Sequence, residues 1–513
     1  MFSLLNPLVY SPLLLLFSLL FLSKWLFASK SKGSIPPSPP KLPFIGNLHQ
    51  LGFLPHRNLR KLAHKYGPLM LLHFGSRPAL IVSSIEGARD IMKTNDLKFS
   101  NRPTKSFGHK LFYDTKDVAF ATYGEHWRQL KSIVVMQLLT NKRVQSFHNV
   151  REEEAAYMIS KIEKQRCSSP SAPVNLSEMF IELTNDVICR IAYGRKYTGR
   201  EGVRKFKYVL GELVEVLGAF NVADYIPWLG WINRLNGLDA KVEKVGRELD
   251  AIMEGVVEEH IERYKREESG GVKEERDIGQ QDLVDVLLEI QKDNADKYTL
   301  HRDSIKGVVL DMFLAGTDTT FTALEWTMTE LIRHPKALKK LQDEVRAVGG
   351  GKPLLTEDDV QKMPYLKAVM KEAIRLHPPA PLLIRQSTKD ANVLGYDIAA
   401  GTQAFINNWA IARDPTLWEN PDEFEPERFF KTSINFYGHD FELLPFGSGR
   451  RSCPGILFAT TVNELGLASV VYRYDFTLPG GIRGEDIDMS EVPGLSNPRK
   501  YPLLVFPKPY YTF

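Results

Sequence analysis

The sequence predicts one large, mainly helical domain with a small β component, preceded by a single N-terminal transmembrane helix. Three observations carry this prediction: an apolar stretch at the start of the chain, helical spacing of apolar residues through the body, and two short strand patterns early in it. The 513 residues are 43% hydrophobic, which is enough to bury a core without disulfide bonds. No internal repeat and no second shift of composition divides the body further.

The N-terminal apolar stretch runs from Leu8 to Phe27, and Lys24 is its only charged residue. About 20 apolar residues are enough for a helix to cross the ~30 Å hydrocarbon layer of a bilayer. Lysines follow the stretch and none precedes it, so the positive-inside rule places the N-terminus in the lumen and the body in the cytosol. A cleaved signal peptide is the alternative, but the basic residues that begin such peptides are missing here.

Three parts of the chain follow from these features. Residues 1–29 are expected to form the transmembrane signal anchor, and residues 30–47 a basic, proline-rich hinge. Its prolines favour a stiff, extended backbone, which suits a spacer between the membrane and the body. Residues 48–513 are expected to form the cytosolic catalytic domain.

The body begins with strand patterns and continues with helical ones. Leu69–Phe74 and Ala79–Ser83 are apolar runs separated by turn-forming residues, which predicts two strands. From Ile305 the apolar residues follow i, i+3, i+4, i+7 spacing, and the pattern continues to Arg333, where Pro335 stops it. A helix of this length would span roughly 43 Å at 1.5 Å per residue, enough to cross a whole domain.

Composition excludes several classes of protein. The chain has 66 Lys+Arg against 62 Asp+Glu, a net charge of +4 and no long basic block, so nucleic acid is not an expected partner. Only three cysteines occur, Cys167, Cys189 and Cys453, which argues against a secreted disulfide framework and for a reducing compartment. No glycine-rich dinucleotide fingerprint follows a strand, so we expect no nicotinamide site on this chain.

One glycine-bounded loop near the C-terminus carries the strongest chemical signal. It reads FGSGRRSCPG over Phe446–Gly455 and places Arg451 two positions before Cys453. A thiolate binds iron only while it is deprotonated, and backbone N–H groups and a nearby cation favour that state. The glycines let the backbone turn and approach a flat cofactor closely. A buried cysteine beside a turn, without a ligand, is the alternative.

This loop resembles the haem-binding signature of the cytochrome P-450 haem-thiolate monooxygenases, with Cys453 as the axial ligand. Further motifs of that family stand in the same order: Ala315–Thr320 resembles the oxygen-activation motif, Glu372–Arg375 the E-x-x-R pair, and Pro426–Phe429 the P-E-R-F motif, whose Arg428 would join the pair. The resemblance covers essentially the whole chain and points to the plant microsomal A-type branch. It implies haem b as the cofactor, O2 as a co-substrate, and a single-pass location in the endoplasmic reticulum membrane.

The resemblance also implies roles for three groups of residues. Asp318 and Thr319 would relay protons to bound oxygen, because a neighbouring acid and hydroxyl can do so; hydroxyls that bond back to helix carbonyls are the alternative. The expected cofactor-binding residues are Trp127, Lys131, Arg385, Phe446, Arg451 and Cys453. Lys131 stands where arginine is usual, so its contact lacks the bidentate fork. The expected substrate residues, in an apolar pocket above the haem, are Phe112, Ala315, Leu382, Leu383 and Leu495.

The leading functional hypothesis is insertion of one oxygen atom from O2 into a small lipophilic plant specialised metabolite, by hydroxylation or a related oxidation. Terpenoid, phenolic, alkaloid and oxime substrates all stay open. Electrons would come from NADPH through a separate membrane-bound NADPH–haemoprotein reductase, docked on the cysteine side near Arg450 and Arg451. Two alternatives remain: a haem-thiolate isomerase or dehydratase that does not use O2, and a membrane haem-binding protein without activity. The acid–alcohol pair Asp318-Thr319 argues against both.

Overall fold

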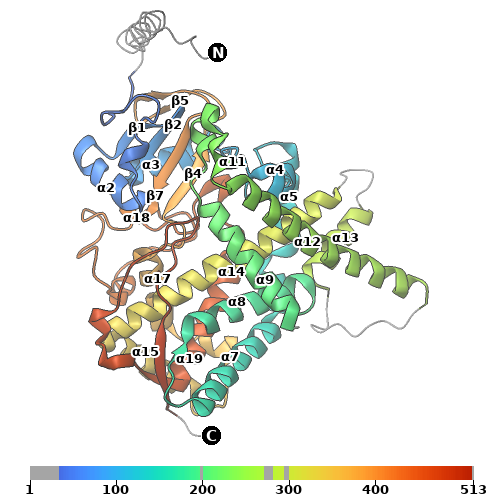
Figure 1. The fold of residues 1–513 in the computed structure, drawn as a ribbon. Helices are drawn as coiled ribbons and strands as arrows, with labels where there is room; N and C mark the ends of the chain where they lie inside the picture. Colours follow the sequence, from blue (N-terminus) through green and yellow to red (C-terminus); the bar gives the residue numbers. More distant parts are fainter. Residues whose placement is uncertain (1–33, 197–199, 271–280, 294–299, 511–513) are drawn as a thin grey trace, which may run out of the picture.

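The computed structural model describes residues 34–196, 200–270, 281–293 and 300–510 (Figure 1). Most of these residues are helical, and the main sheet lies at one end of the molecule with the N-terminal part of the body. The predicted mainly helical fold with a small β component is therefore confirmed. The predicted anchor, residues 1–29, lies outside the described residues, as does the start of the hinge. Of the helices that the structure describes, none is long and apolar enough to span a bilayer.

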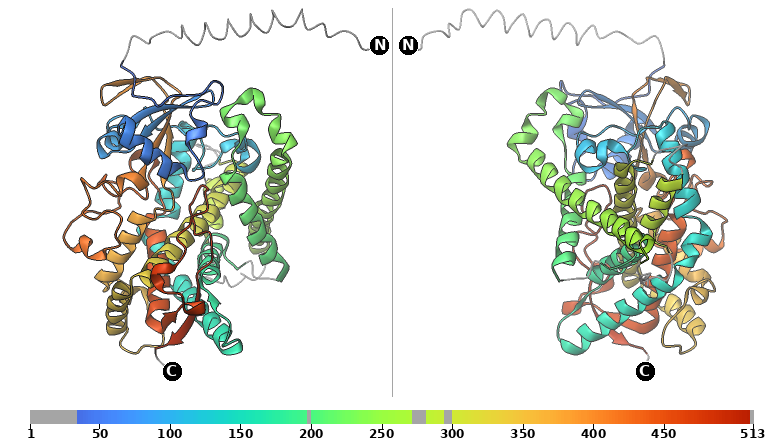
Figure 2. Two further views of the ribbon diagram at one scale, coloured as in Figure 1. Left: turned by 60° about the vertical axis from the view of Figure 1, so that its left-hand side comes forward. Right: turned by 90° about the vertical axis from the view of Figure 1, so that its right-hand side faces the viewer.

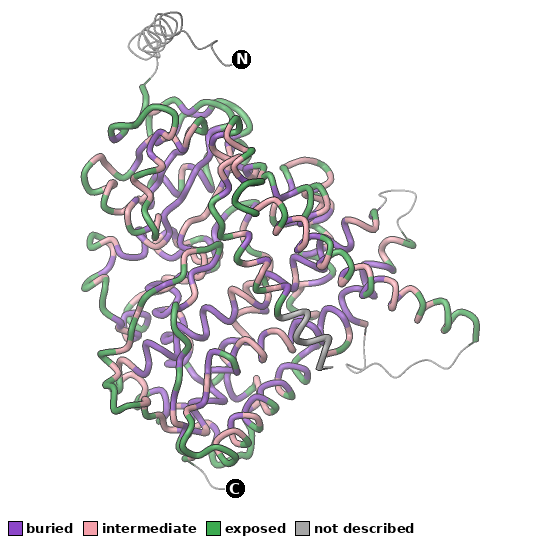
Figure 3. The backbone as a smooth tube through the Cα atoms, viewed as in Figure 1, coloured by how far each residue is buried: buried purple, intermediate pink, exposed green. Residues whose placement is uncertain are grey.

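Long helices make up the interior, and short ones connect them. The α-helices are α2 (Pro55–Tyr66), α3 (Ile85–Arg89), α4 (Gly108–Leu111), α5 (Glu125–Ile133), α6 (Asn141–Ser146), α7 (His148–Ser168), α8 (Leu176–Tyr193), α9 (Arg200–Gly218), α10 (Val222–Tyr225), α11 (Ile232–Leu235), α12 (Leu238–Glu268), α13 (Leu283–Asp293), α14 (Arg302–Arg333), α15 (Pro335–Gly349), α16 (Glu357–Val360), α17 (Pro364–Leu376), α18 (Asn408–Ile411) and α19 (Ile456–Arg473). Figure 3 shows buried residues concentrated in the interior and exposed residues along the outer edge.

The main sheet has four strands in the order β1–β2–β7–β4. They are β1 (Leu69–Phe74), β2 (Arg77–Val82), β7 (Gln403–Asn407) and β4 (Leu382–Gln386). The two predicted strands are confirmed: β1 has the predicted bounds, and β2 starts two residues earlier than expected. β2 pairs antiparallel with β1 and parallel with β7, and β7 pairs antiparallel with β4. The sheet therefore joins the N-terminal residues to a segment more than three hundred positions later.

Both faces of this sheet are covered. Along β2, Leu80 and Val82 belong to one buried apolar cluster, whereas Ala79 and Ile81 belong to another. Burial on both faces explains why the strand reads as a continuous apolar run and not as an alternating one. The smaller strands are β3 (Val174–Asn175), β5 (Ala391–Val393), β6 (Tyr396–Ile398), β8 (Tyr474–Thr477) and β9 (Leu504–Pro509).

Helix α14 crosses the centre of the molecule, as the yellow helix in Figures 1 and 2 shows. It runs for 32 residues, starts three residues before the predicted Ile305 and ends at the predicted Arg333. Pro335 opens the next helix, and the residue before a proline is disfavoured in the helical region, so the chain changes direction here. Because α14 packs against α8, α17 and α19, most of its side chains are buried.

A buried ion cluster joins α17 to the P-E-R-F turn. Arg375 donates to both carboxylate oxygens of Glu372 at 2.7 and 2.9 Å, and Arg428 donates to Glu372 Oε1 at 2.9 Å. Glu372 and Arg375 are both 0% exposed, so this is not an ordinary surface pair. The expected joining of Arg428 to the pair is confirmed. The remaining guanidinium hydrogens of Arg375 go to backbone carbonyls, which satisfies its charge without water.

Candidate active site

Cys453 lies in the loop between a short 3-10 turn, Gly449–Arg451, and the first turn of α19. Its backbone N–H donates to the carbonyl oxygen of Phe446 at 2.9 Å, and the N–H of Gly455 donates to its Sγ at 3.4 Å. Gly449 has φ +69°, and a Cβ there would meet the carbonyl oxygen of Met92 at 2.4 Å. A glycine is therefore required on both conformational and steric grounds.

The Cys453 side chain is exposed, but to an internal cavity of about 340 Å³ and not to the outer surface. The surrounding protein excludes water, and this burial raises the pKa of the Cys453 thiol. The Gly455 N–H and the positive charge of Lys131 act in the opposite direction. A metal ion bound to Sγ would add the positive charge that favours a thiolate at this position.

Four cationic side chains line the same cavity: Arg102, Lys131, Arg385 and Arg451. Burial lowers the pKa of each of them, to about 10 for Arg102, about 8 for Lys131 and about 9 for Arg451, and the arginines also repel one another. Arg385 Nη1 is buried without a hydrogen-bond partner in the part of the chain that the structure describes. Buried cations are unfavourable without anions to pair with. The cavity is therefore suited to a ligand with several negative charges.

Hydrogen bonds to backbone carbonyls hold these cations in place. Lys131 Nζ donates to Ser452 O and Arg385 Nη2 to Ser448 O, both at 2.8 Å. Arg451 Nε donates to Ser100 O at 2.7 Å, and its guanidinium lies 4.0 Å from the centre of the Trp127 ring. Arg451 is buried, so it cannot serve as the surface charge expected for reductase docking; Arg450 is exposed and pairs with Asp96.

The structure brings all six expected cofactor-binding residues to the cavity wall. These residues are Trp127, Lys131, Arg385, Phe446, Arg451 and Cys453. Their chemistry fits haem b: one thiolate ligand for iron, cations for two propionates, and apolar or aromatic groups for the ring. The unpartnered Arg385 Nη1 is the observation that tests this fit, because a propionate oxygen is an acceptor of the kind it lacks.

Arg102 is a candidate cofactor residue that the sequence analysis missed. Its Nε donates to Ala119 O at 3.2 Å, and it lines the cavity together with the three expected cations. It stands in the loop Asn101-Arg102-Pro103, where neither periodicity nor motif spacing separates it from other arginines. No signal in a single sequence identifies it.

The opposite wall comes from α14, where Ala315, Gly316, Thr319 and Thr320 line the cavity. Thr319 Oγ1 donates to Ala315 O at 2.7 Å, which is the back-bonded arrangement that the sequence left open as an alternative. The helix is continuous across Gly316. A Cβ on Gly316 would meet Ile188 at 3.1 Å, so this glycine allows close packing of α8 on α14.

Asp318 and Thr319 are neighbours in sequence, but their side chains point to different places. Asp318 is not among the cavity-lining residues, and its Oδ2 accepts a hydrogen bond from the hydroxyl of Ser496. Burial raises the pKa of Asp318, and the Ser496 hydroxyl counteracts part of that rise. The expected relay pair is thus divided between the cavity and a C-terminal loop.

Of the five expected substrate residues, Ala315 and Leu383 line the cavity. Phe112 is fully buried in an aromatic group, with its ring centre 4.4 Å from that of Phe120. Leu382 precedes Leu383 on β4 and therefore points to the opposite face of the sheet. Leu495 is 45% exposed in a surface loop. Phe112, Leu382 and Leu495 are thus placed outside the cavity wall.

Asp311, which the sequence analysis also missed, holds one segment of the cavity wall against α14. Its Oδ2 accepts from the backbone N–H groups of Val118 at 2.7 Å and Ala119 at 3.2 Å. Asp117 lies beside it, and burial raises the pKa of both carboxyl groups, to about 6 for Asp117. Through these two bonds Asp311 holds the backbone of Val118 and Ala119 against α14.

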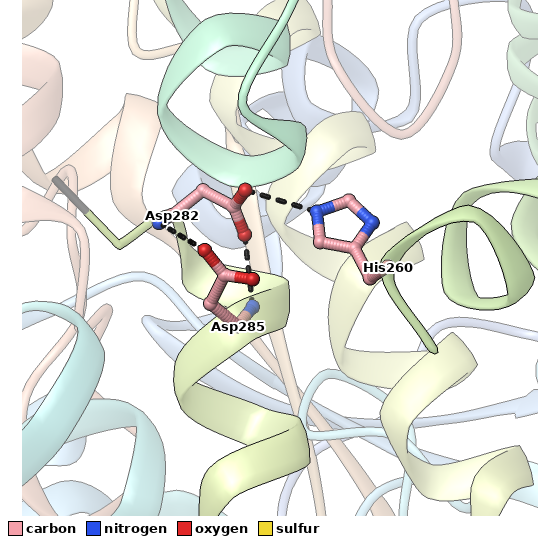
Figure 4. Close-up of side chains that lie close together, drawn as sticks. All are labelled: His260, Asp282 and Asp285. Atoms are coloured by element: carbon pink, nitrogen blue, oxygen red, sulfur yellow. Dashed lines mark hydrogen bonds and ion pairs between the residues drawn. The ribbon is translucent and has the colours of Figure 1, made fainter. Parts of the chain in front are cut away.

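A second cluster has the composition of a metal site, but its side chains already form hydrogen bonds and ion pairs with protein groups (Figure 4). His260, Asp282 and Asp285 lie within reach of one ion. His260 Nδ1 faces Val256 O at 2.7 Å and Nε2 faces Asp282 at 2.9 Å, so both nitrogens face acceptors, as in a protonated imidazole. Arg263 contacts both carboxylates. This cluster is an ion-pair network that joins α12 to the start of α13.

The chain is similar to known proteins over nearly its whole length. Residues 36–506 match the family model described as cytochrome P450. A cytochrome P450 of Prunus mume is 52% identical and covers 99% of this chain and 97% of its own, and (+)-menthofuran synthase of Mentha piperita is 52% identical over 98% of each. A zebra fish cytochrome P450 solved with abiraterone has a TM-score of 0.75 at 24% identity, over 90% of this chain and 100% of its own, which supports the fold alone.

Proposed function

Because this chain belongs to the cytochrome P450 family, we propose that it is a monooxygenase that inserts one oxygen atom from O2 into a small lipophilic plant specialised metabolite. Relatives at about half identity are plant proteins, and one of them is named for making menthofuran, which supports a role in plant metabolism. Haem b, when bound, supplies the activation of O2. The observation that carries the proposal is the convergence of Cys453 and four cationic side chains on one cavity.

The residues of this chain would hold the cofactor in three ways. Cys453 would ligate the iron, with the Gly455 N–H stabilising its sulfur. Arg102, Lys131, Arg385 and Arg451 would pair with the propionates, and Trp127 and Phe446 would pack beside the ring. The hydrogen bonds that already fix the cations to backbone carbonyls reduce the entropy that they lose on binding.

Proton delivery would come from α14. Thr319 presents its hydroxyl at the cavity wall, and Asp318 is the nearest acid along the helix. The back-bond from Thr319 to Ala315 O occupies the hydroxyl hydrogen, but the hydroxyl oxygen can still accept a hydrogen bond. We propose that this oxygen orients a water molecule in the cavity and that Asp318 supplies the proton.

The substrate would lie against a mostly apolar wall. Val118, Met312, Ala315, Ala380 and Leu383 contribute to it. Asp311 reaches this wall, where its Oδ2 accepts from two backbone N–H groups and burial disfavours its charged form. Such a wall selects neutral lipophilic molecules by shape.

The proposed chain organisation is a signal anchor at residues 1–29, a hinge at 30–47 and a cytosolic catalytic domain at 48–513, in the endoplasmic reticulum membrane. An exposed apolar group near the first described residues supports a bilayer as partner: Phe44, Trp228 and Trp231 are each more than half exposed, and the Phe44 and Trp228 rings are 5.9 Å apart. NADPH would be used through a separate membrane-bound reductase.

The test is reconstitution of the full-length chain with haem, a plant NADPH reductase and a panel of lipophilic metabolites under oxygen-18-labelled O2. We expect a red-shifted carbon monoxide spectrum of the reduced protein and a product that carries one labelled oxygen atom. Replacement Cys453→His should remove both. A product formed equally without O2 would instead support an isomerase or dehydratase.

A further inference from the structure

The contact between Ser496 and Asp318 connects a C-terminal loop to the proposed relay. We propose that Ser496 is a positioning residue: its hydroxyl holds the Asp318 carboxyl at the C-terminal loop, where Asp318 takes up the proton that it then passes towards Thr319. This inference rests on the proposed monooxygenase function. In each cycle Asp318 would give one proton towards the cavity and take one up from solvent, so its protonation state is restored.

Ser496 and Asp318 are joined by a hydrogen bond between their side chains. Asp318 is partly buried on α14, and Ser496, 1% exposed, is the side chain that donates to its carboxylate. Burial disfavours the charged carboxylate, so Asp318 keeps a proton at a higher pH than an exposed aspartate does. A carboxyl in that state suits a proton donor, but a donor is effective only if its orientation is fixed. Ser496 is the group that fixes it.

Ser496 can orient Asp318 because the loop that carries it is itself fixed. The next residue, Asn497, donates its N–H to Pro379 O at 3.1 Å and accepts at its carbonyl from Trp326 Nε1 at 2.9 Å. Trp326 lies on α14 two turns beyond Asp318, and Pro379 lines the cavity. Hydrogen bonds therefore fix the loop to α14 on one side and to Pro379, a cavity-lining residue, on the other.

The same loop reaches the surface immediately before Ser496. Residues 492, 494 and 495 are exposed, whereas Ser496 and Asn497 are buried. Ser496 is thus the point at which the chain turns from solvent into the interior. The Ser496–Asp318 contact therefore lies one residue along the chain from exposed Leu495.

The experiment compares full-length holoenzyme carrying Ser496→Ala, Ser496→Thr or Asp318→Asn with the wild type. Each is reconstituted with reductase, and the product formed and peroxide released per NADPH are measured in light and heavy water. We expect Ser496→Ala to lower the product per NADPH several-fold, to raise peroxide and to enlarge the solvent isotope effect, as Asp318→Asn does. Ser496→Thr keeps the hydroxyl and should restore wild-type values. Ser490→Ala, an exposed serine of the same segment, should change nothing.

Infrared spectra give a readout that does not depend on turnover. The carboxyl stretching band that Asp318→Asn removes should shift in Ser496→Ala and return to its place in Ser496→Thr. A wild-type chain that forms no oxygenated product would overturn both the proposed function and this inference. A wild-type chain that couples normally, with Ser496→Ala giving the same coupling and isotope effect, would overturn this inference alone. The carbon monoxide spectrum of each variant establishes that it has folded around its haem.

Discussion

Lys131 on α5 donates a hydrogen bond from Nζ to the carbonyl oxygen of Ser452, the residue before Cys453, at 2.8 Å. The ammonium therefore supports the cysteine loop directly, besides adding positive charge to the cavity. Burial lowers its pKa to about 8, and the nearby Cys453 charge opposes that change. A lysine can make this single contact at a position where the family more often has arginine, because one donor is sufficient for one carbonyl.

Replacement Lys131→Ala should therefore weaken haem retention, because it removes one donor to the loop and one cation from the cavity. We expect several-fold faster transfer of haem to apomyoglobin, followed by absorbance. Lys131→Arg should keep most of the retention. Lys93→Ala, at an exposed position, serves as the control. Equal transfer rates for Lys131→Ala and the wild type would show that the contact contributes nothing to cofactor binding.

Glu372→Gln should destabilise the fold. The carboxylate is fully buried between Arg375 and Arg428, so its loss leaves two guanidinium groups without their anion. Breaking a buried ion pair in this way costs about 3–5 kcal/mol of unfolding free energy. Urea unfolding, followed by loss of the haem absorbance, measures the change, with exposed Glu262→Gln as the control. A loss below about 1 kcal/mol, typical of a surface pair, would contradict the structural role.

His260 should give stability that depends on pH. Burial opposes the charged imidazole, but the hydrogen bond and charge of Asp282 outweigh it, and the pKa of His260 is raised above 6.5. The imidazole is therefore charged in the folded protein up to a higher pH than in the unfolded chain. The stability that this charge contributes is fully present below pH 6.5, and it is lost as the pH rises through the pKa of His260 in the folded protein.

We therefore expect His260→Gln to lower the unfolding free energy by about 1–3 kcal/mol below pH 6.5, and by less at alkaline pH. Urea unfolding at several pH values measures this difference. His439→Gln, at an exposed histidine, should leave the profile of the wild type unchanged. A His260→Gln effect that is the same at every pH would mean that the residue contributes through packing.

The proposed topology can be tested with a sequence that reports the luminal side. Asn175-Leu176-Ser177 is an acceptor sequence for N-glycosylation, and a body in the cytosol leaves it unmodified. In the folded protein Ser177 is buried and donates to Glu325, so an added glycan would also conflict with packing. Protease added to sealed microsomes should digest the body and spare a short N-terminal fragment. A protected, glycosylated body would reverse the proposed orientation.

The elements that the sequence predicted well are those with local signals. The end of α14 at Arg333 follows from Pro335, and β1 follows from an apolar run bounded by turn residues. The sequence predicts the start of β2 two residues too late, because proline is typical of turns. In the structure Pro78 is the second residue of β2 and pairs with His73, and a proline is tolerated near the start of a strand.

Contacts between distant segments could not be predicted from periodicity. The parallel pairing of β2 with β7 and the position of Arg102 beside Arg385 depend on the complete fold. For the site, motif resemblance identified the cysteine loop and the cations, because each stands in a recognisable local pattern. It did not reveal that Asp318 is held by Ser496, since a serine in a loop has no spacing relationship to a helix that ends more than 160 positions earlier.

The peptide groups of residues 117–121 connect the two halves of the cavity. The Val118 N–H is held by Asp311 of α14, while its carbonyl accepts from Trp127 at 3.0 Å and from Arg451 of the cysteine loop at 3.4 Å. Because these contacts use backbone atoms, the side chain of residue 118 can be exchanged while the wall keeps its position. The backbone contacts hold this segment in place, whereas Val118 and Ala119 also line the cavity. New substrate preferences can arise there by single substitutions that leave cofactor binding undisturbed.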